Sequence, residues 1–206
     1  MDFINKFPLE DSQKKYLKEL AGEIKNVMPD SLYYHSINTL EYAGSIAEKF
    51  LSDFPGFDFF SLSIACLLHD YGKIFSYEEL VKIVEENNLK VSSLELKMPQ
   101  LLHSFVGDYL VSRDFSITKT KILRAIRYHT IGYCNMSVED KILFIADKVE
   151  KSRNYEGVEY LRALSLENIN LCLLELYKNN IIYIIKRNNL MHPDTVRVWN
   201  NICGGI

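Results

Sequence analysis

Two carboxylates in this chain lie where an apolar core is expected to continue. The segment FFSLSIACLLHD (residues 59–70) is almost wholly apolar and ends in His69 and Asp70. A second carboxylate, Asp147, lies within the apolar stretch ILFIADKV. A buried carboxylate without a partner costs several kcal/mol, or its pKa rises until it is neutral. Both groups therefore need a cation, which a metal ion or a basic side chain could supply.

Each carboxylate also has a simpler explanation. Asp70 could end a helix in contact with water, because histidine followed by aspartate is a common dipeptide. Asp147 could form a salt bridge with Arg127 or Lys148, an alternative of equal weight if only this position is considered. The choice therefore depends on which other residues accompany the two carboxylates.

Histidines accompany both carboxylates. Four of the five histidines of the chain fall on candidate core-facing helices. His129 shares a helix face with Ile122 and Ile126, and His103 begins the inward face of another helix. Any one of them could be a satisfied core histidine, but their number favours a metal site. The candidate ligands are His35, His69, Asp70, His103, His129 and Asp147.

Imidazole and carboxylate groups suit borderline and hard divalent ions. The four cysteines, Cys66, Cys134, Cys172 and Cys203, are scattered and form no CxxC pair. They indicate reduced thiols rather than a structural zinc site, so a catalytic site is expected. With no long apolar run in the sequence, this predicts a cytoplasmic protein without a membrane span.

Composition limits the classes of substrate and partner. The chain has 206 residues, 48% hydrophobic and 25% charged, as is typical of one globular domain. Its net charge of −3 gives no excess of positive charge to bind a nucleic acid. An anionic substrate would need local positive charge, from a metal ion or from basic residues near the candidate ligands.

Apolar residues recur at three- and four-residue spacing, which predicts an all-α fold of roughly eight to ten helices. The expected helices span 10–27, 33–51, 58–70, 76–87, 99–113, 118–130, 137–150, 156–163, 166–188 and 193–202. Ser76 and Ser137 are the expected N-caps of two of them. We expect residues 1–206 to form a single domain, with residues 1–29 contributing a peripheral N-terminal helix.

The order of the candidate ligands resembles the signature of the HD-domain phosphohydrolase superfamily, an all-helical fold. That signature is a histidine, an HD pair and a later aspartate, here His35, His69, Asp70 and Asp147. The two further histidines between the HD pair and the last aspartate resemble the subset of HD proteins that hold two metal ions. The resemblance implies an HD-domain helical bundle with a dinuclear centre.

Longer stretches resemble one family, the YqeK-type HD hydrolases, which cleave diadenosine tetraphosphate symmetrically to two ADP. The matching stretches are ACLLHDYGK (65–73), LLHSFVGDYL (101–110), AIRYHTIG (125–132), MSVEDKILFIADKVEKSRNYEGVEYLR (136–162) and LMHPDTVRVWN (190–200). The resemblance covers residues 31–201 and implies a bis(5'-nucleosyl)-tetraphosphatase (symmetrical).

The resemblance also implies an assignment of ligands to two divalent metal ions. His35, His69, Asp70 and Asp147 would hold one ion, while Asp70, His103 and His129 would hold the other. Iron is the metal that the resemblance favours, although Mn, Co, Ni and Zn accept the same donors. Two such ions, roughly 3.5–4 Å apart, generate a hydroxide that attacks the phosphate.

Other residues are candidates for contact with the substrate. Lys73, in the motif HDxxK, could assist catalysis and bind a phosphate oxygen, or be a solvated surface lysine. Arg127 and Arg153 could bind phosphate or pair with carboxylates such as Glu150. Tyr71 and Tyr128 could stack on an adenine, although most tyrosines lie at the edge of a core. His192, before Pro193, could equally be a capping or packing residue.

Two positions depart from the family pattern. Leu32 and Tyr133 stand where family members often carry basic residues, which puts the substrate in more doubt than the metal site. A different nucleotide is therefore an alternative: a nucleoside monophosphate, a guanosine alarmone or a cyclic dinucleotide. A non-catalytic nucleotide-binding HD domain is another. The apolar segment 166–188 could face the core or a second copy in a homodimer.

Overall fold

The structure is a computed structural model that describes residues 2–204, and it contains no strand within them. The predicted all-α class is therefore confirmed. The α-helices of these residues are α1 (Asp11–Val27), α2 (Asp30–Phe50), α3 (Phe59–Leu68), α4 (Tyr77–Glu86), α5 (Ser93–Leu96), α6 (Pro99–Phe115), α7 (Thr120–Tyr128), α8 (Val138–Val149), α9 (Val158–Glu167), α10 (Ile169–Lys186) and α11 (Pro193–Gly204). Short 3₁₀ helices are η1 (Asp2–Lys6), η2 (Leu51–Asp53) and η3 (Tyr71–Ile74).

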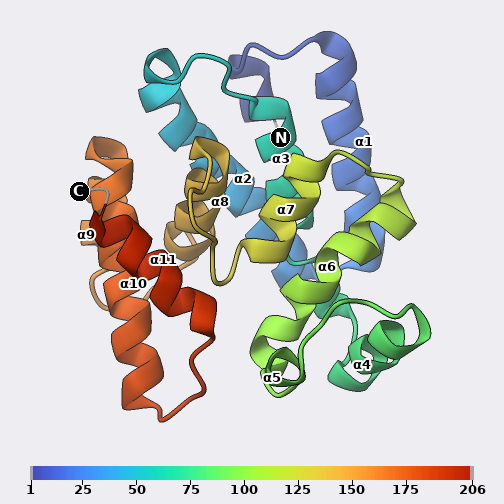
Figure 1. Cartoon of the computed structure of the whole chain (residues 1–206). Coiled ribbons are helices and arrows are strands. Elements are labelled where there is room, and N and C mark those ends of the chain that lie inside the picture. Colours follow the sequence, from blue (N-terminus) through green and yellow to red (C-terminus); the bar gives the residue numbers. More distant parts are fainter. Residues whose placement is uncertain (1, 205–206) are drawn as a thin grey trace.

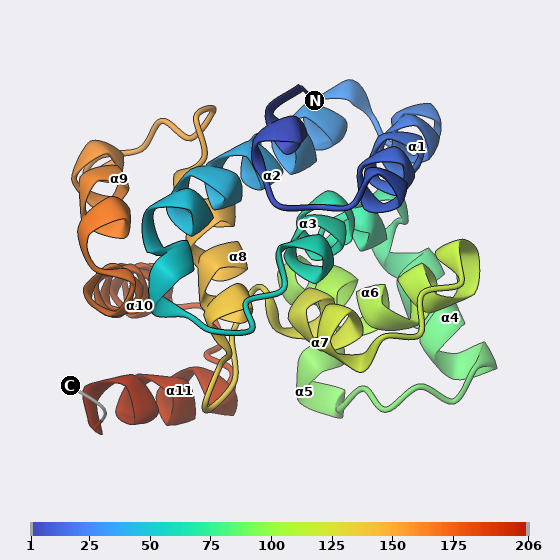
Figure 2. The same ribbon diagram turned by 90° about the horizontal axis from the view of Figure 1, so that it is seen from above.

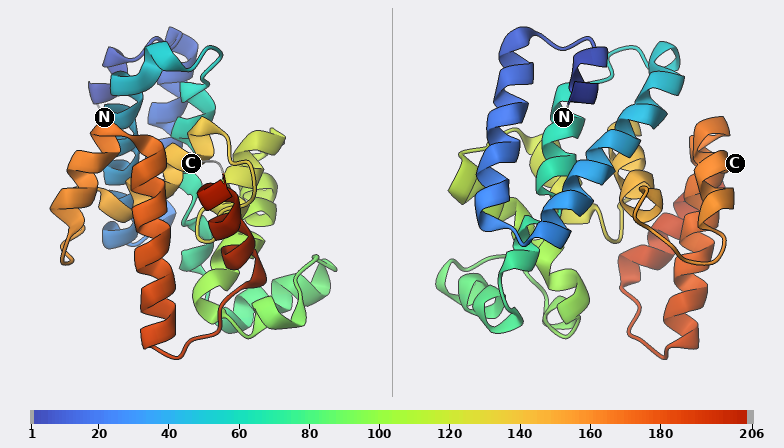
Figure 3. Two further views of the ribbon diagram at one scale, coloured as in Figure 1. Left: turned by 60° about the vertical axis from the view of Figure 1, so that its left-hand side comes forward. Right: turned by 180° about the vertical axis from the view of Figure 1, so that it is seen from behind.

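Three helices from distant parts of the chain, α2, α3 and α8, pack against one another at the centre. Helices α6 and α7 lie on one side of them and α9 and α10 on the other (Figures 1 and 2). Helices α4 and α5 pack on α6, and α11 packs on α10. The view from behind shows α1 and α2 in front of the other helices (Figure 3).

Helix α3 is apolar on all sides, as expected for a helix enclosed by others. All of its residues except Phe60 are buried. Asp58 caps its N-terminus, accepting a hydrogen bond of 2.9 Å from the backbone N–H of Ser61. The C-terminus of α3 consequently ends inside the protein, where His69 and Asp70 follow.

Helix α1 is amphipathic and packs on α3 and α2. Its buried residues are Leu17, Leu20, Ala21 and Ile24, which recur at helical spacing along one face. These residues join a core that is continuous through the centre of the molecule. Within residues 2–204, no helix combines the length and apolarity needed to cross a membrane.

Most helix boundaries follow the sequence expectations, and the predicted caps Ser76 and Ser137 are both observed. Two differences concern the site: α3 and α7 end at Leu68 and Tyr128, before the candidate ligands. Helix α5 was not expected, because its four residues are too short to show a helical period. Helix α9 continues to Glu167 rather than 163, since the break falls at the Asn168 cap of α10.

Candidate metal centre

The structure brings the six predicted ligands together from five parts of the chain. His35 lies on α2, His103 on α6 and Asp147 on α8. His69 and His129 are the residues directly after α3 and α7. Together with Asp70 they form two groups that could each hold a metal ion, and the ligand atoms of each group lie within 4.8 Å of one another.

The first group contains His35, His69, Asp70 and Asp147. Nε2 of His35 lies 3.0 Å from Oδ1 of Asp147 and 3.5 Å from Oδ2 of Asp70. Nε2 of His69 lies 3.4 Å from the same Asp70 oxygen and 3.7 Å from Oδ1 of Asp147. Two imidazole nitrogens and two carboxylate oxygens thus surround one point.

The second group contains the other oxygen of the same carboxylate. Oδ1 of Asp70 lies 3.2 Å from Nε2 of His103 and 3.3 Å from Nε2 of His129. Asp70 therefore presents one oxygen to each group, the arrangement required of a bridging ligand.

The histidine hydrogen bonds leave lone pairs pointing at the centre. Nδ1 of His69 donates to the carbonyl of Cys66 at 2.8 Å, and Nδ1 of His129 donates to that of Ile126 at 2.7 Å. These carbonyls belong to the last turns of α3 and α7, which lack helical partners. When such a ring is neutral, with its proton on Nδ1, it turns an unprotonated Nε2 toward the carboxylates. Ring nitrogens and carboxylate oxygens then converge in both groups, and a cation fits that set.

Burial makes the need for positive charge stronger. Oδ1 of Asp70 is buried and has no hydrogen-bond partner within residues 2–204. Burial lowers the pKa of His69, but Asp70 and Asp147 outweigh it and raise that pKa to about 9. Burial also lowers the pKa of His129, to about 4. These nitrogen and oxygen donors fit divalent ions, and no cysteine belongs to either group.

A further carboxylate, Glu150, supports the first group and was not assigned to the site from sequence. Its Oε1 lies 3.1 Å from Nδ1 of His35, and its side chain also accepts hydrogen bonds from the backbone and hydroxyl of Ser152. Carboxylates that bind the outer nitrogen of a metal-ligating histidine fix its tautomer and orientation. The sequence gives little indication of this role, because Glu150 comes directly after the apolar segment and resembles an exposed residue that ends a helix.

The comparisons with known proteins agree with this geometry. The HD domain model matches residues 32–152, which include all six ligands. The chain belongs to the HD domain family. This confirms the prediction of an HD-type helical bundle.

Two enzymes with a known activity are similar to this HD domain protein over most of its length. The symmetrical bis(5'-nucleosyl)-tetraphosphatase of Bacillus subtilis is 32% identical, over 91% of this chain and 98% of its own length. The enzyme of the same description from Halalkalibacterium halodurans is 30% identical, over 87% of this chain and 92% of its own length. These relatives confirm the predicted family and the prediction of a hydrolase.

A solved structure also supports membership of the HD domain family. It is a predicted HD superfamily hydrolase involved in NAD metabolism from Clostridium acetobutylicum. The two chains are 27% identical and superpose with a TM-score of 0.84, over 92% of this chain and 97% of the other. The helical arrangement around the two ligand groups is therefore that of an HD hydrolase.

Three basic side chains lie at the metal centre. Nζ of Lys73 lies 2.6 Å from Oδ2 of Asp70, and Nη2 of Arg153 lies 2.8 Å from Oδ1 of Asp147. Nζ of Lys148 lies 3.3 Å from Oδ2 of Asp147. Burial lowers the pKa of Lys148, and the carboxylate of Asp147 opposes that effect. Basic side chains thus lie beside the carboxylates of both Asp70 and Asp147.

The other candidates for substrate contact lie close to the ligands in sequence, and their side chains form contacts with other residues. Arg127 donates to the carbonyls of Phe105 and Lys90 and pairs with Asp108. Tyr71 is buried, and its hydroxyl donates to Asp114. Within residues 2–204, neither side chain forms a hydrogen bond with a ligand of the metal centre.

Tyr128 and His192 are also engaged in packing. The ring of Tyr128 lies against that of Tyr133, with 5.4 Å between centroids. His192 is buried beside Phe105, and its Nε2 lies 3.4 Å from Oε1 of Glu95. Tyr133 itself donates to Asp140, with the guanidinium of Arg124 over its ring.

Proposed function

We propose that this HD domain protein hydrolyses dinucleoside tetraphosphates symmetrically and converts diadenosine tetraphosphate to two ADP. The observation that carries the proposal is the sharing of Asp70 between two ligand groups, one oxygen to each. The substrate class is supported by the activity of the two relatives that match most of the chain. Cytoplasmic location and a small-molecule nucleotide partner belong to the same proposal.

The residues of the two groups would hold two divalent ions, with Asp70 between them. Iron is the metal that the family resemblance favours, and the same donors accept Mn, Co, Ni or Zn. When bound, such ions supply the positive charge that lowers the pKa of an attacking water and neutralises phosphate oxygens. Glu150 would keep the His35 ring in the orientation that points Nε2 inward.

The reaction adds one water across the middle of the tetraphosphate. The water oxygen attacks one of the two central phosphorus atoms, and the bond from that phosphorus to the central bridging oxygen breaks. The leaving half departs as ADP, and the attacked half, which keeps the water oxygen, is also ADP. Lys73, Lys148 and Arg153 would bind and orient the phosphates, because their charged nitrogens already lie beside the ligand carboxylates.

The whole chain would act as one domain in this reaction. The ligands come from α2, α3, α6, α7 and α8, and the core that packs these helices is continuous. We propose residues 1–206 as that domain, with residues 1–29 forming its periphery.

The test is anaerobic turnover of diadenosine tetraphosphate with Fe(II) or Mn(II). Products are identified by chromatography, and the metal content per chain is measured on the same sample. We expect ADP as the single nucleotide product and about two metal ions per chain, the number that two ligand groups require.

The product pattern can also contradict the proposal. ATP together with AMP would show cleavage away from the centre of the tetraphosphate. No turnover despite bound metal would favour the alternative nucleotides, to be tested as a panel of nucleoside monophosphates, guanosine alarmones and cyclic dinucleotides. Failure with the whole panel would favour a non-catalytic nucleotide-binding domain.

A further inference from the structure

A cavity of about 440 Å³ lies beside the metal centre, between the end of α8 and the middle of α10. We call it the α8–α10 pocket. Its volume is in the range of pockets that hold small ligands. Its lining residues come from three parts of the chain: the segment 148–155, helix α9 and helix α10.

Two of the lining residues of the α8–α10 pocket are basic and contact a candidate metal ligand. Lys148 and Arg153 line the pocket, and both contact the carboxylate of Asp147. Nη2 of Arg153 also lies 3.2 Å from Nε2 of His35. A molecule in the pocket would therefore have its anionic end at the metal ligands.

The rest of the pocket is suited to a flat, partly apolar group. Leu161 and Leu176 contribute apolar lining, and Tyr155 and Tyr183 line the same pocket. Tyr183 is 55% exposed and Tyr155 is 42% exposed. The hydroxyl of Tyr155 donates to the carbonyl of Lys148, which fixes its ring at the pocket. Exposed rings of this kind offer faces on which a nucleobase can stack.

Two carboxamides add directional polar groups. Asn179 and Asn180 line the same pocket on α10. Within residues 2–204, neither side chain forms a hydrogen bond with another protein group. Each amide offers both donors and an acceptor, the set that a base edge or a ribose hydroxyl can use.

We infer that the α8–α10 pocket is a nucleoside subsite, which binds the base and ribose of one half of the substrate while its phosphates extend to the metal centre. The inference rests on the proposed function and deepens it. The pocket combines basic side chains beside the metal ligands with apolar, aromatic and carboxamide side chains, which are the groups that phosphates, a base and a ribose would use.

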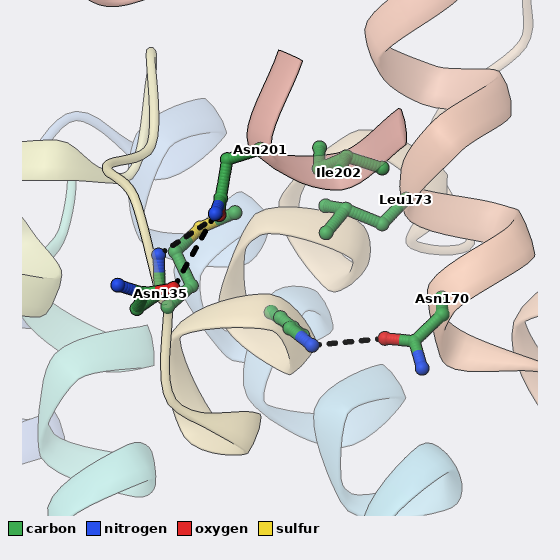
Figure 4. A pocket seen from close by; sticks show the side chains of 7 residues that line it. Asn135, Asn170, Leu173, Asn201 and Ile202 are labelled. Atoms are coloured by element: carbon green, nitrogen blue, oxygen red, sulfur yellow. Dashed lines mark hydrogen bonds between the residues drawn. The ribbon is translucent and has the colours of Figure 1, made fainter. Parts of the chain in front are cut away.

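A second cavity lacks the contact with the metal ligands that a nucleoside subsite needs. The cavity in Figure 4 has a volume of about 380 Å³ and is lined by Asn135, Asn170, Asn201 and their neighbours. Its one lysine, Lys141, donates to the side chain of Asn170 at 2.9 Å. No residue of either ligand group lines this cavity, so phosphates bound there would not reach the metal ligands.

The test compares ADP with pyrophosphate, which has the charge but lacks the nucleoside. Calorimetric titration of the metal-loaded, full-length protein gives the affinity for each. We expect the unaltered protein to bind ADP more tightly than pyrophosphate. Tyr183→Ala and Asn180→Ala should each weaken ADP binding, by about tenfold for the tyrosine as expected for one lost stacking surface, and leave pyrophosphate binding unchanged.

Two further variants serve as controls. Tyr183→Phe keeps the ring and should retain ADP binding. Tyr160→Ala removes a tyrosine that is 61% exposed on α9 but lies outside the pocket lining, and it should change neither affinity. Equal affinities of the unaltered protein for ADP and pyrophosphate would overturn the inference. Unchanged ADP affinity in Tyr183→Ala and Asn180→Ala, or equal loss of both ligands, would also overturn it.

The two proposals can fail separately. If diadenosine tetraphosphate is not hydrolysed to ADP but Tyr183→Ala selectively loses ADP binding, the subsite stands and the proposed reaction fails. If the reaction proceeds to two ADP while both pocket variants keep their ADP affinity and KM, the reaction stands and the subsite fails.

Discussion

Oε1 of Glu150 lies 3.1 Å from Nδ1 of His35, on the side of the ring opposite to Asp70 and Asp147. Glu150 is fully buried, so this contact is shielded from water. Burial raises the pKa of Glu150, but hydrogen bonds from His35 and Ser152 outweigh it and lower that pKa to about 2. The carboxylate is therefore ionised and holds the His35 proton on Nδ1.

Glu150→Gln should weaken metal binding at the first ligand group without removing a ligand. The amide oxygen can still accept from His35, but the negative charge that raises the basicity of the ring is lost. We expect a loss of about 10- to 100-fold in affinity for one metal ion, measured by competition with a chelator.

The second ligand group should keep its affinity in this variant, because Glu150 contacts only His35 among the ligands. Glu159→Gln is the matched control, since the Glu159 side chain is 82% exposed and pairs with Arg162. Equal loss of both ions would indicate a general effect on the fold rather than positioning of His35.

Asp70→Ala and Lys73→Ala should separate metal binding from substrate binding. Asp70 gives one oxygen to each ligand group, so its removal should abolish both metal loading and turnover. Lys73 contacts Asp70 but belongs to neither group. Its removal should leave metal content near the unaltered level and raise KM for the nucleotide. Metal content by elemental analysis and steady-state kinetics provide the two readouts.

Lys82→Ala is the control for the loss of one lysine, because the Lys82 side chain is 72% exposed and pairs with Glu86 at the protein surface. Equal metal loss in the Asp70 and Lys73 variants would contradict the role given to Lys73. Unchanged KM in Lys73→Ala would contradict it as well.

Asp58 predicts a pH dependence of stability away from the metal centre. It caps α3 and pairs with Lys119 and Lys121, at 2.8 Å and 2.5 Å. Burial raises the pKa of Asp58, but hydrogen bonds from the two lysines and from Ser61 outweigh it and hold that pKa well below its usual range. Its folded pKa is therefore lower than the unfolded value of about 3.9. The contribution of Asp58 to the free energy of unfolding is present above about pH 4 and is lost as the pH falls through the folded pKa.

Asp58→Asn isolates that contribution, because asparagine can still cap the helix but cannot form the ion pairs. At pH 6 we expect the variant to unfold more easily by about 0.5–1 kcal/mol, the value of partly exposed ion pairs. This difference in the free energy of unfolding between the variant and the unaltered protein should shrink below about pH 4. Urea unfolding at both pH values measures it. A gap that is constant or grows with acid would contradict the assignment.

The candidate metal ligands were predictable from the sequence because their chemistry conflicts with their sequence surroundings. His69, Asp70 and Asp147 are polar residues in apolar runs, and such a conflict is visible without a structure. Their division between two groups came from the resemblance rather than from spacing. The orientation of the two rings is visible only in the structure. Helices α3 and α7 end before His69 and His129, so each ring forms a hydrogen bond with the last turn of the helix that precedes it.

Residues that act through packing or through long-range contacts were harder to predict. Glu150 meets His35 across 115 positions of the chain, and no local pattern encodes that contact. Tyr183 and Asn180 lie on a helix whose sequence gives no indication of a neighbouring site. Helix α5 was missed because a single helical turn has no measurable period.

Gly72 offers a test of how closely η3 must approach α6 to form the second ligand group. A Cβ built on Gly72 would lie 2.3 Å from the backbone oxygen of His103. Real Cβ atoms do not approach backbone this closely, so Gly72→Ala must move η3, which carries Lys73, away from His103. Because Asp70 directly precedes η3, the variant should lose metal from the group of Asp70, His103 and His129 and should unfold at a lower temperature.

Gly22→Ala is the matched control for the same change. Gly22 lies within α1, where no atom of residues 2–204 outside the neighbouring helix backbone lies within 4 Å of an added Cβ. Alanine favours a helix over glycine by about 1 kcal/mol, so this variant should be slightly more stable and keep its metal content. Thermal unfolding and metal analysis of both variants give the comparison. If Gly72→Ala keeps both its metal content and its Tm, the close approach of η3 to His103 is not required for the centre.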